Sequence, residues 1–158
     1  MTTGGCHCGR VRYKATGQPE WSVGCCCRDC TRLAGAPFVV MVGFAPEQVA
    51  FETAPDYCET SPGVIRGACP SCHTQVTYGR AKGFEAGSPL LYLMAASFDD
   101  PEAHPPQEVV WYASRPSWLE LRTDIPLHDG VSDVNAARSY ATVVAQKERD
   151  NDEGERTA

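Results

Sequence analysis

The chain contains nine cysteines, and seven of them fall into short clusters whose spacing is typical of metal ligands. These are a C-x-C pair, a C-x-C-x-x-C cluster and a C-x-x-C pair: Cys6 and Cys8; Cys25, Cys27 and Cys30 (the triplet); Cys69 and Cys72. The two pairs together supply four thiolates (the tetrad), which is the usual ligand set of a structural zinc ion. The triplet would leave the fourth position of a second zinc ion open to water or substrate. The sequence therefore predicts two zinc ions per chain, one in a closed site and one in an open site.

The start of the chain supports metal binding over disulfide formation. Residues 1–5 lack the charged and apolar regions of a signal peptide, and no apolar run approaches the length of a membrane span. We therefore expect a cytoplasmic protein with no membrane partner, in which clustered cysteines stay reduced. The net charge of −6, with Lys and Arg dispersed along the chain, argues against nucleic acid as a partner.

The apolar pattern predicts a mainly β fold. Residues 11–15 alternate between apolar and charged side chains, as in a half-buried strand. Further strands are expected at residues 21–24, 38–44, 49–51, 57–59, 64–66, 75–78, 90–96 and 109–112, between turns rich in Pro, Gly, Asp and Ser. Strands this short and closely spaced favour an antiparallel barrel or a sandwich, and 158 residues are enough for one such core.

The local pattern around the triplet separates its expected ligands from the cysteine between them. In an extended chain Cys25 and Cys27 project to the same side, and Cys26 projects to the other side. We therefore expect Cys26 in the core. Residues 28–33 have room for about two helical turns before a Gly and a Pro end them, so Cys30 would come from the start of this helix.

The cysteines allow other interpretations. Cys58, or a group from outside the chain, could close the triplet site as a fourth ligand, although a lone cysteine is more often a small buried apolar residue. Residues 69–73 match the C-x-x-C-H motif of haem attachment, but the missing export signal and the matching N-terminal pair argue against haem. His73 is expected at a positive φ, where Gly would otherwise stand. The large aromatic residues are expected in the core rather than around a substrate: Tyr78, Tyr92, Trp111 and Trp118.

Several ordered motifs resemble the glutathione-dependent formaldehyde-activating enzyme family, which also includes centromere protein V. The matching segments are GGCHCGRVRY at residues 4–13, the triplet, GAPF at 35–38, residues 69–78, SFDDPE at 97–102, Trp111 and RPSWL at 115–119. The resemblance reaches to about residue 125. It implies a β-tent fold of short antiparallel strands, with a structural zinc ion on the tetrad and a catalytic zinc ion on the triplet. His73 departs from the family pattern, which usually has Gly there.

We expect residues 1–128 to form the zinc-binding domain and residues 129–158 to form a helical extension with a charged, disordered tail. Ser132 and Asp133 can cap a helix whose apolar residues fall near one face: Val134, Ala137, Ala141 and Val144. The tail composition is typical of a solvated segment.

An open zinc site with three thiolate ligands is expected to bind and activate a thiol. Zinc with three thiolates carries a formal charge of −1, so it is a poor source of hydroxide but still lowers the pKa of a bound thiol. The resemblance implies a carbon-sulfur lyase that forms or cleaves adducts of glutathione with an aldehyde, such as S-hydroxymethylglutathione. Cations would be needed for the two carboxylates of glutathione, and the candidates are Arg28, Arg32, Arg66 and Arg80. The alternative is a non-catalytic zinc module that binds glutathione or, through its extension, a protein partner.

Overall fold

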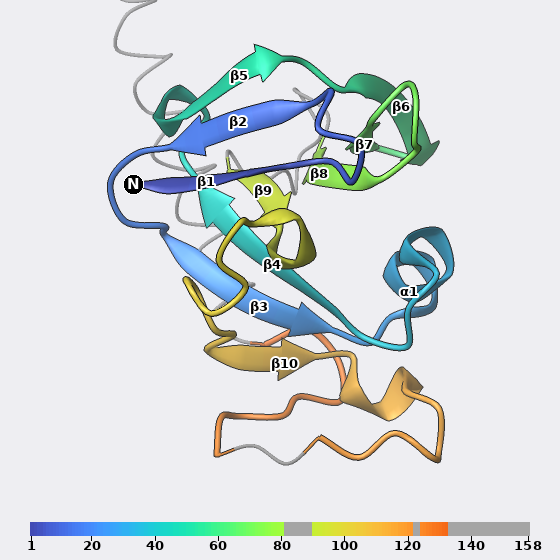
Figure 1. Cartoon of the computed structure of the whole chain (residues 1–158). Helices are drawn as coiled ribbons and strands as arrows, with labels where there is room; N and C mark the ends of the chain where they lie inside the picture. The colour runs from blue at the N-terminus through green and yellow to red at the C-terminus, as the bar shows by residue number, and fades with distance from the viewer. Residues whose placement is uncertain (81–89, 122–123, 133–158) are drawn as a thin grey trace, which may run out of the picture.

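A computed structural model of the chain describes residues 1–80, 90–121 and 124–132, and these are mainly β (Figure 1). Its strands are β1 (Thr2–Gly5), β2 (Arg12–Ala15), β3 (Trp21–Cys25), β4 (Val39–Phe44), β5 (Val49–Thr53), β6 (Asp56–Ser61), β7 (Val64–Ala68), β8 (Gln75–Arg80), β9 (Leu91–Met94) and β10 (Glu108–Val110). The helical elements in this part of the chain are α1 (Arg28–Ala34) and the 3₁₀ turns η1 (Pro46–Gln48), η2 (Ala95–Ser97) and η3 (Tyr112–Ser114). The expected mainly β fold is confirmed.

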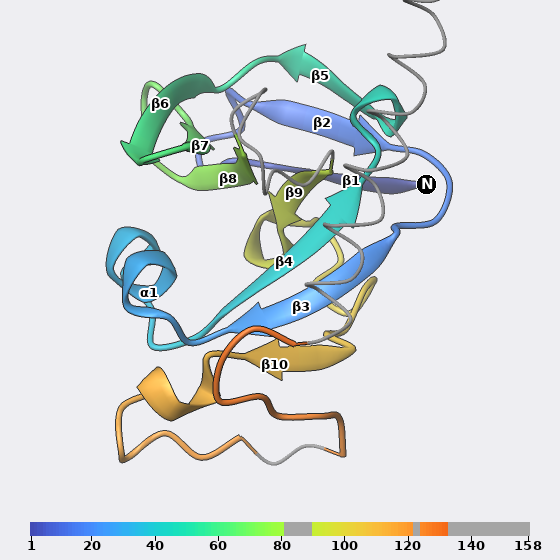
Figure 2. The same ribbon diagram turned by 180° about the vertical axis from the view of Figure 1, so that it is seen from behind.

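The strands form two sheets. The smaller sheet has the order β1-β2-β5, and the larger has the order β10-β3-β4-β9-β8-β7-β6. Neighbouring strands are antiparallel, as predicted, except that β10 pairs with β3 in parallel. In both views the smaller sheet lies across β4 and β9, and α1 lies beyond the end of β3 (Figures 1 and 2).

Both faces of the central strands are buried, which explains why their sequences are apolar at nearly every position. One face of β4 and β9 packs against the smaller sheet, and its core comprises Tyr13, Ala15, Val42, Phe44, Leu93 and Phe98. The opposite face belongs to a second core that contains Trp21, Val23, Met41, Tyr92 and Met94, together with Cys25 and Cys30 of the triplet. The triplet is therefore anchored in a packed core.

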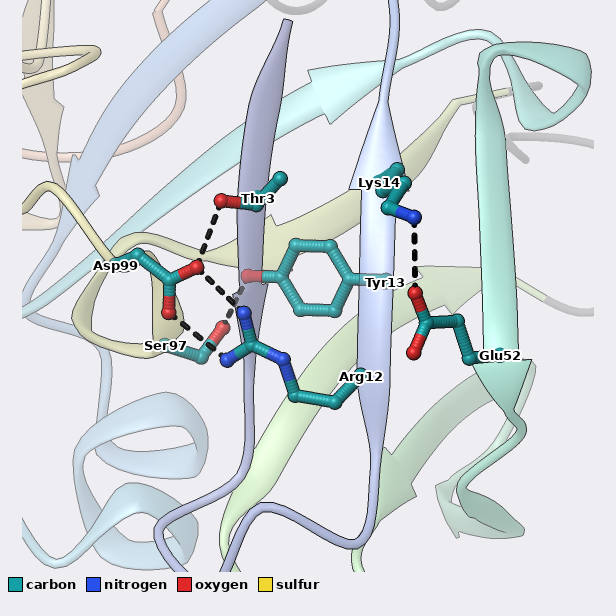
Figure 3. Close-up of polar contacts among 7 residues, drawn as sticks. All are labelled: Thr3, Arg12, Tyr13, Lys14, Glu52, Ser97 and Asp99. Carbon is teal, nitrogen blue, oxygen red and sulfur yellow. Dashed lines mark hydrogen bonds and ion pairs between the residues drawn. The ribbon is translucent and has the colours of Figure 1, made fainter.

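Polar contacts attach the segment after β9 to the smaller sheet (Figure 3). The Tyr13 hydroxyl lies 2.7 Å from Ser97 Oγ, and burial raises the pKa of Tyr13 well above its usual range. Arg12 donates two hydrogen bonds to Asp99, at 2.8 and 2.5 Å, and Thr3 donates a third at 2.6 Å. Lys14 pairs with Glu52 on the neighbouring β5. These contacts fix β1 and β2 and thereby the turn between them.

The structure adds one strand that was not predicted and contradicts the expected burial of two tryptophans and of Cys58. Strand β1 was not predicted, because Thr2–Gly5 has almost no apolar character and acquires its strand conformation by pairing with β2. Trp111 and Trp118 are not core residues, since their exposed fractions are 41% and 72%. Trp111 follows directly on β10 at a φ of 56°, which turns the chain out of the sheet. Cys58 is exposed rather than buried, because it lies on the edge strand β6.

The chain after η3 returns to β10. The backbone N–H of His128 donates to the carbonyl of Val109, and the N–H of Trp111 donates to the carbonyl of Gly130. Ser132 is buried and donates a hydrogen bond of 2.9 Å to the buried carboxylate of Glu108. The helix expected around residues 134–144 and the charged tail lie outside the described residues. Within the described ranges, no helix is long and apolar enough to cross a membrane.

Candidate functional site

The tetrad joins two turns that are far apart in the sequence. Cys6 and Cys8 lie between β1 and β2, whereas Cys69 and Cys72 lie between β7 and β8 of the other sheet. All four Sγ atoms lie within 4.8 Å of one another, with Sγ–Sγ distances of 3.5 Å between Cys6 and Cys8 and 3.7 Å between Cys8 and Cys69. Four sulfurs bound to zinc at about 2.3 Å in a tetrahedron would be about 3.8 Å apart. The donor set therefore fits one zinc ion that connects the two sheets.

The turn conformation at Cys69 and Cys72 brings donors toward the sulfurs. His73 has a φ of 58°, which confirms the expected positive φ at this position. The N–H of Ser71 donates to Cys69 Sγ at 3.4 Å, and hydrogen bonds from the hydroxyl and backbone N–H of Thr74 lower the pKa of Cys72 to about 5. Donors of this kind stabilise thiolates, which are the form that binds metal.

The triplet is assembled within one short segment. Cys25 ends β3, Cys27 is the N-cap of α1, and Cys30 lies in the first turn of that helix. Their Sγ atoms lie within 4.8 Å of one another, with Cys25 and Cys30 buried and Cys27 partly exposed. The helix ends as predicted at Gly35, whose φ of 63° is readily adopted only without a side chain.

Hydrogen bonds within the triplet favour a thiolate at Cys27. The N–H of Cys30 donates to Cys27 Sγ at 3.4 Å, and the N–H of Cys27 donates to Cys25 Sγ at the same distance. Hydrogen bonds from the Cys25 and Cys30 thiols hold the pKa of Cys27 well below its usual range. The pKa of Cys25 is raised because it is the donor to Cys27 in this network and is also buried.

Among the described residues, no fourth His, Cys, Asp or Glu side chain converges with the triplet. Cys58 lies outside the cluster, so the alternative in which it closes the site finds no support. Cys26 is 1% exposed and also lies outside the cluster, as its opposite direction in the strand predicted. The triplet is thus a three-sulfur donor set with one tetrahedral position left for another ligand.

Of the four arginines that are candidate cations on sequence grounds, the structure places one beside the triplet. Arg66, on β7, is 4% exposed, and its Nη2 lies 3.7 Å from Cys30 Sγ. Arg28 and Arg32 are exposed, and the side chain of Arg80 is outside the described part. No local pattern in the sequence distinguishes Arg66, because its place beside Cys30 depends on contacts between segments that are far apart in the sequence, such as Asp29 with Ser61 and Cys30 with Arg66.

An aromatic row continues from Arg66 into the core. The guanidinium lies 5.1 Å from the ring centroid of Tyr78, which is 5.6 Å from that of Tyr92. The ring centroid of Tyr92 in turn lies 6.3 Å from that of Trp21. The prediction that Tyr78 and Tyr92 are core aromatics is confirmed for Tyr92, which is buried, while Tyr78 is partly buried against the same core.

Comparison with known proteins bears on both cysteine clusters. The sequence model of a family described as "Glutathione-dependent formaldehyde-activating enzyme" matches residues 1–114, which include the tetrad and the triplet. The crystal structure of a Rhodobacter sphaeroides protein is similar over 79% of this chain and 98% of that chain, with 15% sequence identity and a TM-score of 0.45. A search of curated proteins returned no match.

Proposed function

The chain belongs to the glutathione-dependent formaldehyde-activating enzyme family, and we propose that it is a zinc-dependent carbon-sulfur lyase that forms or cleaves adducts of glutathione with an aldehyde such as formaldehyde. The observation that carries this proposal is the triplet, whose three sulfurs converge without a fourth ligand from the described residues. A closed four-ligand site is normally structural, whereas an open one can take a substrate atom.

In this proposal Cys6, Cys8, Cys69 and Cys72 hold a structural zinc ion, and Cys25, Cys27 and Cys30 hold a catalytic one. When bound at the triplet, zinc would lower the pKa of a thiol in the open position, so that the nucleophilic thiolate is present at neutral pH. The protein orients this site through α1, since its first turn supplies Cys30 and its N-cap is Cys27. The buried side chains of Cys25 and Cys30 keep water from one side of the site.

The reaction needs no oxidant and no further co-reactant. The glutathione sulfur adds to the aldehyde carbon, a C–S bond forms, and the electron pair of the C=O π bond moves to the oxygen. That oxygen then takes up the proton that the thiol released, which gives the hemithioacetal, S-hydroxymethylglutathione when the aldehyde is formaldehyde. The lyase direction is the same sequence reversed. The partners are therefore small thiol and aldehyde molecules, and the cytoplasmic location stays a prediction.

The test is adduct formation from formaldehyde and glutathione, followed by exchange NMR with protein well below the substrate concentration. The proposal requires exchange faster than the spontaneous rate with wild-type protein, and a rate indistinguishable from buffer with Cys27→Ser. Cys58→Ser is the matched control, because it removes an exposed thiol outside both clusters and should leave the rate unchanged. Glutathione binding without any rate enhancement would instead favour the alternative of a non-catalytic zinc module.

A further inference from the structure

Arg66 is a buried cation without a carboxylate partner in the described part of the chain. None of the salt bridges among the described residues involves it. The carboxylates of two nearby elements are engaged elsewhere, since Asp29 accepts from Ser61 and Glu59 accepts from the N–H of Gly63. An unpaired buried charge is costly, so a negative group must lie close to this guanidinium.

The triplet is such a group, because Arg66 Nη2 lies 3.7 Å from Cys30 Sγ. Three thiolates and one zinc ion carry a net charge of −1, which one guanidinium brings to zero. With a fourth thiolate bound, the net charge of the metal site would be −1 if Arg66 is counted and −2 without Arg66. A neutral fourth ligand adds no charge and should depend much less on the guanidinium.

Neutral contacts hold the guanidinium in place. Nη1 donates to Thr60 Oγ1, and the guanidinium lies over the ring of Tyr78. Arg66 is flanked on both sides by paired strands, with Cys58 opposite on β6 and Tyr78 opposite on β8. Nε has no hydrogen-bond partner among the described residues, so the side chain is positioned without using all of its donors.

We propose that Arg66 is a positioning residue that makes the triplet metal site select an anionic fourth ligand, a thiolate, over a neutral one. This inference rests on the proposed zinc site at the triplet and explains why a site that already holds three thiolates would accept a fourth. It does not depend on glutathione, since the selected feature is the charge of the ligand atom.

The test compares two small ligands on protein with cobalt at the triplet, where binding is followed by the change in metal absorption. 2-Mercaptoethanol binds as a thiolate without carboxylates, and imidazole binds as a neutral ligand. In Arg66→Gln, which keeps an N–H donor but loses the charge, the affinity for mercaptoethanol should fall about 10- to 100-fold, as is common when a partner of a metal ligand is removed. The affinity for imidazole should change much less, and Arg66→Lys should restore most of the preference for thiol.

Arg28→Gln is the matched control, because it removes the same charge from an exposed position beside Cys27 and should preserve the ligand preference. If Arg66→Gln did not fold, Thr60→Val would carry the test, since it leaves the charge but removes the hydroxyl that holds Nη1, and thiol preference should fall. An unchanged ratio of the two affinities, or an equal loss of both, would overturn the proposal. Either result would leave the proposed enzyme activity untouched, because that activity is tested separately through adduct formation with glutathione.

Discussion

Replacing Cys69 by Ser should destabilise the protein about twice as much as replacing Cys27 by Ser, although each change removes one metal ligand. The tetrad connects positions 61 residues apart, as from Cys8 to Cys69, and does so between two sheets. A cross-link that closes a loop of this length reduces the entropy of the unfolded chain by an amount equivalent to about 4 kcal/mol. The triplet spans only from Cys25 to Cys30, a separation of 30 − 25 = 5 residues, for which the same relation gives about 2 kcal/mol.

These free energies translate into separate melting temperatures. For a chain of this size, 1 kcal/mol shifts Tm by about 2 to 4 °C, so Cys69→Ser should lower Tm by about 8 to 16 °C and Cys27→Ser by about 4 to 8 °C. The assay is thermal unfolding followed by circular dichroism, at equal zinc and protein concentrations. Cys58→Ser should melt within about 2 °C of wild type, because the thiol is exposed and outside both clusters.

Excess chelator provides a second comparison. It should remove most of the difference between wild type and Cys69→Ser, since both then lack the connection between the sheets. If Cys69→Ser and Cys27→Ser lowered Tm equally in the presence of zinc, the assignment of the tetrad as the structural site would be wrong.

Two further predictions concern parts of the fold away from the triplet. Burial lowers the pKa of His104, so the unfolded chain binds a proton at this side chain at a higher pH than the folded protein does. The free energy of unfolding should therefore fall as the pH drops below about 6.5. In urea melts between pH 7 and pH 5, His104→Gln should lose less stability than wild type. A chain ending after Ser132 should be as stable as the full chain, whereas one ending after Gly130 should lose about 1 to 3 kcal/mol, because the buried carboxylate of Glu108 loses the Ser132 hydroxyl. Equal urea midpoints for the two truncations would contradict that role of Ser132.

Local chemistry made part of this molecule predictable. The structure contains three predicted local features: α1 ends at Gly35, His73 has a positive φ, and Cys26 lies outside the triplet. Each of these features is set by a few neighbouring residues. The ligand sets could be proposed from spacing, since a pair of cysteines two or three residues apart can reach one metal ion.

Contacts between distant segments could not be predicted from the sequence. The burial of Arg66 beside Cys30 depends on α1 reaching across to β6 and β7. The parallel pairing of β10 with β3 joins segments that are far apart in the sequence, and β1 forms a strand through its pairing with β2. Trp111 shows the opposite case, in which an aromatic residue at the end of an apolar run leaves the core because the backbone turns there.

The most direct test of a closed and an open metal site is native mass spectrometry of the purified protein with and without glutathione. The proposed sites predict two zinc ions per wild-type chain and one bound glutathione, and one zinc ion with no bound glutathione for Cys27→Ser. A single zinc ion in the wild-type protein, or glutathione bound equally to both proteins, would contradict the account.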